Sequence, residues 1–326
     1  MDTTTPPLQL QVAEVQALNP LITRLRLLAA AGGTLPAYSA GAHLQVQVLL
    51  PDGSAAWRHY SLVDFAGDAA APQAYDIAVR REDAGRGGSR HMHGLQPGTR
   101  LQVLPPRNDF PLQPGSSPVL LLAGGIGITP LLTMAAQCRR QGRPVRLVYA
   151  GRSRALMAFV PELQQLLGSG LQLHADDEAG APLDVGALLA GCAADETVHV
   201  CGPQPLLDAV LAAAKARSWP AARVRFELFT APAAEAGDRG FEVVLSSSGR
   251  TLQVAADQTL LQALIAAGCD PMFDCQRGEC GVCAVPVLDG EIEHRDHVLS
   301  AREKAANNVI QVCVSRAKGA RLVLDL

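Results

Sequence analysis

The chain has 326 residues, of which 48% are hydrophobic and 18% are charged, and its formal net charge at pH 7 is -3. This length favours two or three domains over a single core. The small net charge gives no general affinity for nucleic acid or for an anionic membrane. The sequence shows no signal peptide and no long apolar run. We therefore expect a cytoplasmic protein without nucleic-acid or membrane partners, in a reducing compartment that disfavours disulfides.

Residues 1–108 carry six short segments in which apolar and polar residues alternate, and such segments separated by turns predict an antiparallel barrel. The segments are 8–15, 21–30, 43–50, 58–64, 75–81 and 100–106. Between the last two lies the glycine-rich stretch "REDAGRGGSRHM". Gly85, Gly87 and Gly88 leave backbone N–H groups free and Ser89 adds a hydroxyl, which suits a phosphate. A simple hairpin turn is the alternative.

Residues 109–230 alternate strands and helices, which predicts a doubly wound α/β domain with ligands at the carboxyl ends of its strands. The predicted strands are 117–123, 144–150 and 197–201, and the predicted helices are 130–141, 159–167 and 205–216.

The stretch "GGIGITP", residues 124–130, follows the first of these strands. We expect Thr129 as a helix N-cap and Pro130 as the first helical residue. Gly124, Gly125 and Gly127 let the backbone approach a ligand, and a helix N-terminus attracts phosphate. This is not the dehydrogenase fingerprint, because Pro130 occupies the place of the third glycine. A purely structural turn is the alternative.

The stretch "DCQRGECGVC" contains Cys275, Cys280 and Cys283, and Cys313 follows further along the chain. The spacing C-x4-C-x2-C with one distant cysteine favours a [2Fe–2S] cluster. Zinc sites more often use two short Cys-x2-4-Cys pairs, and incidental buried thiols are the remaining alternative. Gly278 and Gly281 can adopt the backbone angles that a tight loop around a cluster requires.

The residues around these cysteines predict a small sheet with one helix. Strands are expected within 241–254, 284–292 and 321–326. Asp257 is the expected cap of a helix that ends at Gly268. Its expected apolar residues are Leu260, Leu261, Leu264 and Ile265. We expect His294 and His297 to be exposed loop histidines.

The C-terminal segment resembles the β-grasp ferredoxins of the plant type. "GGIGITP", "CGPQPL" and the R-x-Y-S motif in "WRHYSL" resemble the ferredoxin–NADP reductase superfamily. The order of the motifs is similar to that of the phthalate dioxygenase reductase family, including vanillate demethylase reductases. The resemblance implies an FMN-binding β-barrel in 1–108, an NAD(H)-binding α/β domain in 109–230, a linker in 231–240 and a ferredoxin domain in 241–326.

The resemblance also implies the site residues. Those near the hydride transfer are Ser61, Cys201, Glu227 and Phe229. The FMN contacts are Arg58, His59, Tyr60, Ser61, Ala78, Val79, Gly87, Gly88, Ser89, Thr129 and Phe229. The NADH contacts are Gly124, Gly125, Gly127, Ile128, Thr129, Pro130, Arg152, Ser153, Asp177, Cys201, Gly202 and Pro203. The cluster ligands are Cys275, Cys280, Cys283 and Cys313.

The function that the resemblance implies is electron transfer from NADH through FMN and the [2Fe–2S] cluster to a separate Rieske-type oxygenase, by a monomeric reductase. Two other classes are weighed, a stand-alone flavin-dependent oxidase or hydroxylase and a redox-sensing regulatory protein. NADPH is the alternative nucleotide, since Arg152 and Arg154 could hold a 2′-phosphate. FAD is the alternative flavin.

Overall fold

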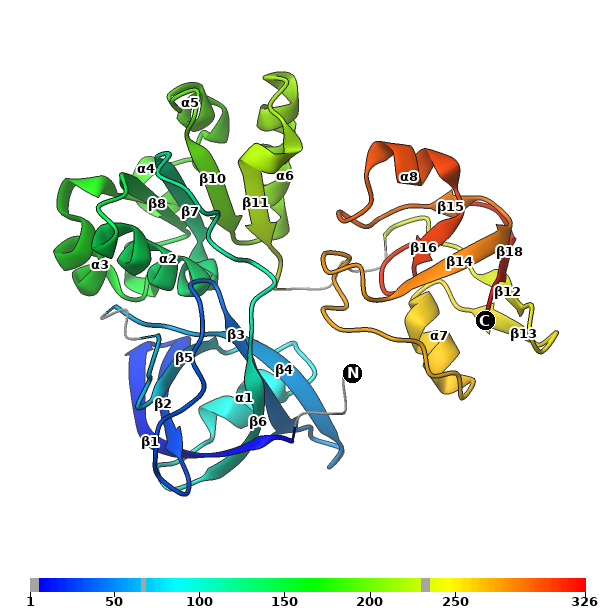
Figure 1. Cartoon of the computed structure of the whole chain (residues 1–326), viewed down its shortest axis with the longest axis horizontal. Coiled ribbons are helices and arrows are strands. Elements are labelled where there is room, and N and C mark those ends of the chain that lie inside the picture. The colour runs from blue at the N-terminus through cyan, green and yellow to red at the C-terminus, as the bar shows by residue number, and fades with distance from the viewer. Residues whose placement is uncertain (1–5, 66–68, 230–234) are drawn as a thin grey trace. The chain divides into compact units, whose positions relative to one another are not determined.

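The computed structural model describes residues 6–65, 69–229 and 235–326. They form two compact units, one that runs to Glu227 and one that begins at Leu228. The first unit contains the barrel, blue to cyan in Figure 1, and the α/β domain, in green. The second unit is the C-terminal sheet and its helices, and the predicted linker 231–240 lies partly outside the described residues.

The predicted six-stranded barrel is confirmed. Its strands are β1 (Leu8–Asn19), β2 (Ile22–Ala29), β3 (His43–Leu49), β4 (Ala55–Ser61), β5 (Tyr75–Arg80) and β6 (Arg100–Arg107). They run in the order β4-β3-β6-β1-β2-β5 with every neighbouring pair antiparallel. A bridge between Leu62 and Ile77 links the two edges of this sheet. The helix α1 (Gly88–His93) follows the glycine-rich stretch between β5 and β6.

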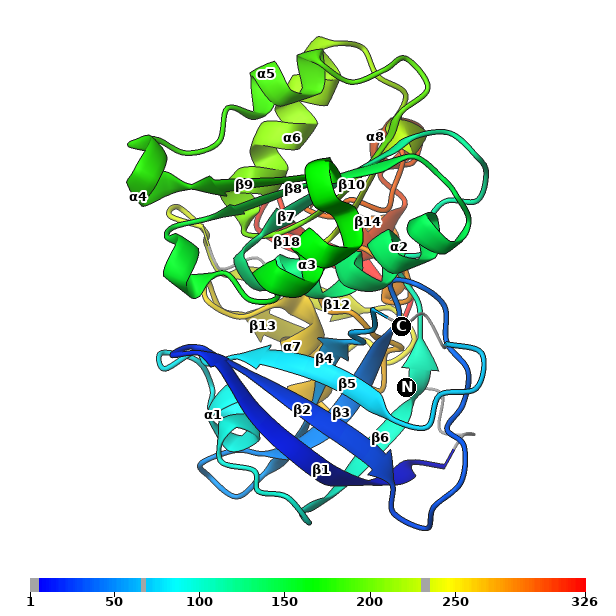
Figure 2. The ribbon, with the colours of Figure 1, turned by 90° about the vertical axis from the view of Figure 1, so that its left-hand side faces the viewer.

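The α/β domain has a parallel sheet with helices on both faces. Its strands are β7 (Val119–Gly124), β8 (Val145–Gly151), β9 (Leu171–Ala175), β10 (Thr197–Cys201) and β11 (Val224–Glu227), in the order β11-β10-β7-β8-β9. Its helices are α2 (Ile128–Arg140), α3 (Val160–Leu167), α4 (Asp176–Ala179), α5 (Val185–Ala190) and α6 (Gln204–Ala216). Figure 2 shows α2 and α3 on one face of this sheet and α5 and α6 on the other. The central strand β7 is buried along its whole length, as its continuous apolar run predicts.

The barrel and the α/β domain share a core. Ala40 and Ala78 of the barrel belong to the same buried cluster as Leu131 of helix α2. The amide of Gly41 donates a 2.9 Å hydrogen bond to the hydroxyl of Thr133 in α2. A Cβ atom on Gly41 would lie 2.0 Å from the carbonyl oxygen of Phe110, so only glycine fits. These contacts join the two domains into one unit.

We predict that Thr133→Val destabilises this unit by about 1–3 kcal/mol, because the buried Gly41 amide loses its acceptor. Urea unfolding followed by tryptophan fluorescence measures the change, since both tryptophans, Trp57 and Trp219, lie in this unit. Thr34→Val, at an exposed position, is the control. Equal stability of the two variants would contradict a structural role for the Thr133 hydroxyl.

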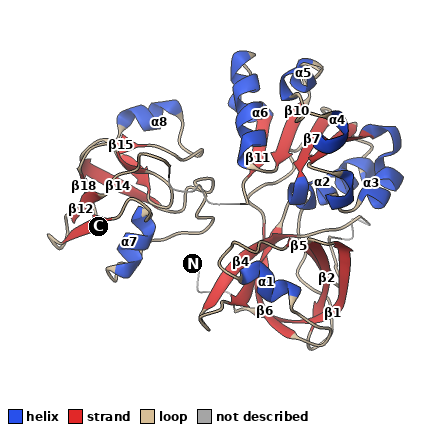
Figure 3. Cartoon of the chain, turned by 180° about the vertical axis from the view of Figure 1, so that it is seen from behind, coloured by secondary structure: helices blue, strands red, loops and turns tan. Residues whose placement is uncertain are grey.

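The second unit is a mixed sheet packed on one helix (Figure 3). Strands β12 (Phe241–Leu245), β13 (Thr251–Val254), β14 (Ala284–Asp289), β16 (Val309–Gln311) and β18 (Arg321–Leu324) run in the order β13-β12-β18-β14-β16. Strands β15 (Ile292–Glu293) and β17 (Arg316–Ala317) form a small second sheet, and α8 is Ala301–Ala306. Leu260, Leu261 and Leu264 of helix α7 (Leu260–Ala266) pack against the main sheet.

One prediction about helix α7 is wrong and one is confirmed. The N-cap is Thr259 and not Asp257, because the Thr259 hydroxyl accepts the Gln262 amide while the Gln262 side chain bonds back. This capping box satisfies two backbone donors at once. Ile265 is 45% exposed, since it lies off the packed face of the helix. Gly268 ends the helix as predicted, with a φ of 78° that favours glycine.

The predicted N-cap of helix α2 is also wrong. The chain first makes a 3-10 turn at Gly125–Gly127, and α2 begins at Ile128 with Gly127 as its N-cap. Thr129 therefore lies inside the first helical turn, where its hydroxyl donates to the carbonyl oxygen of Ile126 at 3.0 Å. Pro130 is also in this turn, where its missing N–H removes no helical hydrogen bond.

Candidate functional site

The four predicted cluster ligands come together in the second unit. The Sγ atoms of Cys283 and Cys313 are 3.1 Å apart. Hydrogen bonds from the thiols of Cys280 and Cys313, followed by backbone amides, lower the pKa of Cys275. Three of the four thiols are buried, and all eight cysteines of the chain are free of disulfides.

This donor set fits a [2Fe–2S] cluster better than one zinc ion. Among residues 6–65, 69–229 and 235–326, no three His, Cys, Asp or Glu side chains are placed to hold a single metal ion. The thiol of Cys275 bonds with those of Cys280 and Cys313, and the thiol of Cys313 also bonds with that of Cys283. The four thiols thus form one linked group, which suits a [2Fe–2S] cluster held by four cysteines.

The loop that carries these cysteines lies directly on a second loop. Gly278 has a φ of 78°, and a Cβ atom there would lie 2.8 Å from Cγ2 of Val314 and 3.1 Å from Cα of Asp296. The amide of His297 donates to the Gly278 carbonyl oxygen at 2.9 Å. The predicted exposure of His294 is wrong, because its side chain is only 8% exposed and its Nδ1 lies 3.5 Å from the buried Asp296 carboxylate. His297 is exposed, as predicted.

We predict that Gly278→Ala prevents normal cluster assembly, because the methyl group has no space in this contact. Iron and labile sulfide in the purified protein measure the loss. Gly268→Ala is a matched control, since Gly268 has the same φ of 78° but nothing within 4 Å of an added Cβ. A full complement of iron and sulfide in Gly278→Ala would show that this contact does not shape the cluster loop.

The two predicted nucleotide motifs meet at adjacent strand ends. Gly124 ends β7, and Cys201 ends the neighbouring β10. A Cβ atom on Gly127 would lie 2.2 Å from the carbonyl oxygen of Cys201, and one on Gly202 would lie 3.0 Å from Cα of Gly124. Gly124, Gly127 and Gly202 are therefore needed for packing. Gly125 differs, because it has a φ of 56° and open space around its Cβ position, which leaves its backbone accessible to a ligand.

The neighbouring strand ends carry the predicted adenosine-side residues. The amide of Asp177, just after β9, donates to the carbonyl oxygen of Arg152, just after β8, at 3.1 Å. Arg152 and Asp177 are exposed, whereas Ser153 is half-buried. Arg154 forms two hydrogen bonds with Glu178, at 2.9 and 2.7 Å, so its guanidinium is already paired. This pairing weakens the alternative in which Arg154 holds a 2′-phosphate.

The predicted flavin phosphate site contains two arginines. The Nε atom of Arg58 on β4 lies 3.2 Å from the position of a Cβ on Gly88, so Arg58 packs on the glycine-rich stretch. Burial lowers the pKa of Arg58, and the positive charge of Arg86 lowers it further. Two guanidiniums beside the glycine-rich backbone fit a phosphate dianion. The Ser89 hydroxyl instead accepts the Glu82 amide at 2.9 Å, and so closes this stretch on itself.

The other residues of the flavin motif lie along the end of strand β4. The Oγ atom of Ser61 is buried and has no hydrogen-bond partner among the described residues. A buried hydroxyl without a partner is costly, so a bound ligand that bonds to it would be stabilised. Burial raises the pKa of Tyr60. The ring of His59 stacks on that of His43, with centroids 4.7 Å apart.

Strand β5 and strand β11 complete the candidate site of the first unit. Ala78 and Val79 are buried in β5, which packs against the 3-10 turn Gly125–Gly127. Ala78 belongs to the same cluster as Ile128 and Cys201. Glu227 is buried at the end of β11 and pairs in register with Cys201. The structure thus brings flavin and nucleotide candidates together at one end of the sheet.

Phe229, the last catalytic candidate, is 37% exposed and belongs to the second unit, so its role stays a prediction. Three residues beside these sites, Arg86, Glu279 and Asp296, were not predicted from the sequence. The charge of Arg86 between two glycines could have indicated a phosphate site, and Glu279 stands beside a cluster ligand. No helix in the described residues is long and apolar enough to cross a membrane.

The fold and these donor sets define an iron–sulfur flavoprotein oxidoreductase. A family model described as a 2Fe-2S iron-sulfur cluster binding domain matches residues 243–318. The chain is 42% identical to the heme-dependent oxidative N-demethylase beta subunit of Ectopseudomonas mendocina, over 98% of this chain and 99% of that one. It is 42% identical to the vanillate O-demethylase oxidoreductase of a Pseudomonas species, over 94% and 95%.

The solved structure of phthalate dioxygenase reductase, a modular protein for electron transfer from pyridine nucleotides to [2Fe–2S], is also similar. It is 37% identical, with a TM-score of 0.73 over 99% of this chain and 100% of that one. The chain belongs to the phthalate dioxygenase reductase family of oxygenase reductases. Membership supports FMN, NADH and a [2Fe–2S] cluster as its cofactors, as the sequence predicted.

Proposed function

We propose that this protein carries electrons from NADH through FMN and its [2Fe–2S] cluster to a Rieske-type terminal oxygenase, as a cytoplasmic monomer. The observation that best supports the proposal has two parts. Four thiols converge in the second unit, and the first unit brings the flavin motif and the nucleotide motif together. One relative, from Comamonas testosteroni, is named a reductase subunit of a toluene-4-sulfonate monooxygenase system, and another is named a vanillate O-demethylase oxidoreductase. When bound, the flavin would accept two electrons together as a hydride and release them one at a time to the cluster.

The residues of the first unit would bind and orient the two organic cofactors. We propose that Arg58 and Arg86, with the backbone of Gly87 and Gly88, hold the flavin phosphate. Ser61 would donate its unpaired hydroxyl to the flavin ring. Tyr60 and His59, with the apolar Ala78 and Val79 and with Thr129 and Phe229, would line the ring site, and Ser89 would hold the phosphate stretch closed.

The nucleotide would lie across the adjoining strand ends. The open backbone at Gly125 suits its diphosphate, while Gly124, Gly127, Gly202 and Pro203 keep the two loops close together. Ile128, Thr129 and Pro130 form the first helical turn beside it. Arg152, Ser153 and Asp177 would contact the adenosine side, and the register pair Cys201 and Glu227 would flank the nicotinamide.

The two other classes fit the structure less well. A stand-alone flavin oxidase or hydroxylase has no use for four converging thiols. A redox sensor would couple its centre to an output domain, whereas the described residues are accounted for by the barrel, the α/β domain and the cluster-binding sheet.

An anaerobic titration tests the proposal. NADH should bleach the cluster absorbance of the purified holoprotein, and the reduced protein should then reduce the iron–sulfur centre of a purified Rieske-type O-demethylating oxygenase, observed by electron paramagnetic resonance. A cluster that stays oxidised with NADH would refute the electron route. One relative is named a subunit of a heme-dependent oxidative N-demethylase. If the reduced protein passed electrons to a heme-dependent demethylase and not to the Rieske protein, only the proposed class of electron acceptor would be refuted.

Arg58→Ala should weaken FMN binding by about tenfold to a hundredfold, the cost of one or two hydrogen bonds to a charged group. Flavin released on dialysis, identified by chromatography, measures the effect. Arg100→Ala, at an exposed position of the same barrel, is the control and should retain its flavin. If the released flavin is FAD, the assignment of a terminal phosphate to this site is wrong.

Ser61→Ala should slow flavin reduction by NADH about tenfold to a hundredfold, because it removes a donor that stabilises charge on the ring. Its FMN content should not change, since the phosphate site is intact. Ser61→Thr keeps a hydroxyl and should react faster than Ser61→Ala. Stopped-flow absorbance measures all three proteins, and a parental rate in Ser61→Ala would exclude this serine from the reaction.

A further inference from the structure

The segment between β11 and β12 contains the predicted linker, yet its described residues belong to the second unit. At its start, the amide of Leu228 donates a 2.7 Å hydrogen bond to Oε1 of Glu279. Glu279 lies between the ligands Cys275 and Cys280. Its other oxygen, Oε2, is 3.3 Å from Nε of Arg277, and both side chains are largely buried. The residue that follows Glu227 is therefore held by the cluster-binding loop itself.

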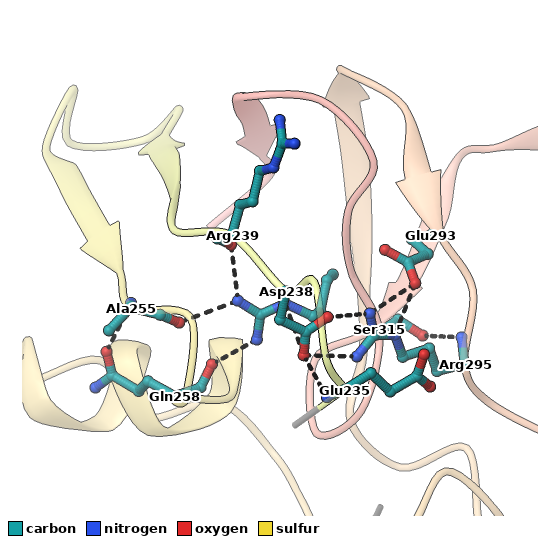
Figure 4. Close-up of polar contacts among 9 residues, drawn as sticks. Glu235, Asp238, Arg239, Ala255, Gln258, Glu293, Arg295 and Ser315 are labelled. Atoms are coloured by element: carbon teal, nitrogen blue, oxygen red, sulfur yellow. Dashed lines mark hydrogen bonds and ion pairs between the residues drawn. The ribbon is translucent and has the colours of Figure 1, made fainter. Parts of the chain in front are cut away.

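At the other end of the segment, the Asp238 carboxylate lies between two arginines (Figure 4). Nη1 of Arg295 bonds to Oδ2 of Asp238 at 3.0 Å, and Nη2 bonds to Oδ1 at 2.5 Å. Nε of Arg316 is 3.9 Å from Oδ2. The Asp238 and Arg295 side chains are only 6% and 13% exposed. Oδ2 also accepts the amide of Glu235 at 2.9 Å, which closes a turn.

Arg316 extends this contact further into the cluster-binding unit. Its guanidinium donates to the carbonyl oxygens of Gln258 at 2.8 Å, Ala255 at 3.0 Å and Arg239 at 3.1 Å. Ala255 and Gln258 precede helix α7, whereas Arg316 begins strand β17. Residues 235–239 are thus fastened to two separate elements of the unit.

We propose that Glu279 and Asp238 are positioning residues that fasten both ends of the segment joining β11 to β12 onto the cluster-binding unit. We call the Leu228–Glu279 contact and the Asp238–Arg295–Arg316 contact the two linker anchors. They lie on either side of residues 230–234, which are outside the described residues. The inference rests on the proposed transfer of electrons from the flavin to the cluster.

The physical consequence concerns the length of free chain. A free flexible segment of the thirteen residues 228–240 would have an end-to-end distance of about 20 Å. With Leu228 held by Glu279, a single peptide bond separates the end of β11 from backbone fixed to the cluster loop. A shorter free connection restricts the separation of the two units and raises the effective concentration of one redox site at the other.

Anaerobic stopped-flow reduction of the full-length holoprotein by NADH tests the positioning role. In Glu279→Ala, flavin reduction should keep its parental rate, while cluster bleaching should slow by about tenfold or more. In Asp238→Ala the Leu228 contact remains, so both rates should stay parental. Glu279→Gln retains an oxygen acceptor for the Leu228 amide and should bleach within about twofold of the parent. Glu291→Gln breaks the exposed Glu291–Lys318 pair of the same unit and is the matched control.

Hydrogen exchange tests the anchors without any electron transfer. The Leu228 amide should exchange faster in Glu279→Ala, and the Glu235 amide should exchange faster in Asp238→Ala, because each loses its acceptor. If Glu279→Ala fails to assemble its cluster, an insertion of four glycine or serine residues between Glu227 and Leu228 decides the kinetic question, because it lengthens the free connection and leaves the cluster loop unchanged.

A parental bleaching rate in Glu279→Ala, or parental exchange at these amides, would overturn the proposal. If NADH does not bleach the parent's cluster, the proposed function fails, and the exchange measurement still tests the anchors.

Discussion

Close approach of backbone to backbone at glycines determines the geometry of the cofactor sites. Gly127 lies against the Cys201 carbonyl so closely that a Cβ atom would be 2.2 Å from its oxygen, and this contact joins the ends of β7 and β10. Gly278 makes the corresponding contact with Asp296 beneath the cluster loop. The opposing atoms at both places include backbone that cannot rotate away. A larger residue would move a loop, and the ligand donors on that loop would move with it.

The sequence predicted the features that depend on local spacing. Alternation over a few residues was enough for the six barrel strands, and the cysteine spacing was enough for four thiols that converge. Features that depend on distant contacts were missed. Thr129 and Asp257 were misassigned as caps because a 3-10 turn and a nearby capping box change where the helices begin. His294 is buried because it packs beside Asp296, and the edge strand β9, which is only partly buried, was not predicted.

The same distinction between local sequence patterns and distant contacts applies to the candidate site. The glycine motifs and the R-x-Y-S motif indicated where cofactors bind, since they lie next to one another in sequence. Contacts between distant residues could not be predicted, such as the charge of Arg86 at Arg58 and the hydrogen bond from Leu228 to Glu279. These contacts explain how the site is held, whereas the motifs explain only what it binds. In the first unit a shared core fixes the flavin and nucleotide candidates together. In the second, the cluster loop also holds the chain that arrives from β11.

If the cluster is the exit for electrons, a Cys283→Ser protein should lose only the last part of the electron route. After iron analysis shows that the cluster is lost, NADH oxidation is measured with two acceptors, ferricyanide and cytochrome c. Ferricyanide reduction should stay within about twofold of the parent, because the flavin and nucleotide sites are intact, and cytochrome c reduction should fall by about tenfold or more. Cytochrome c reduction at the parental rate without a cluster would show that electrons leave the protein by another route.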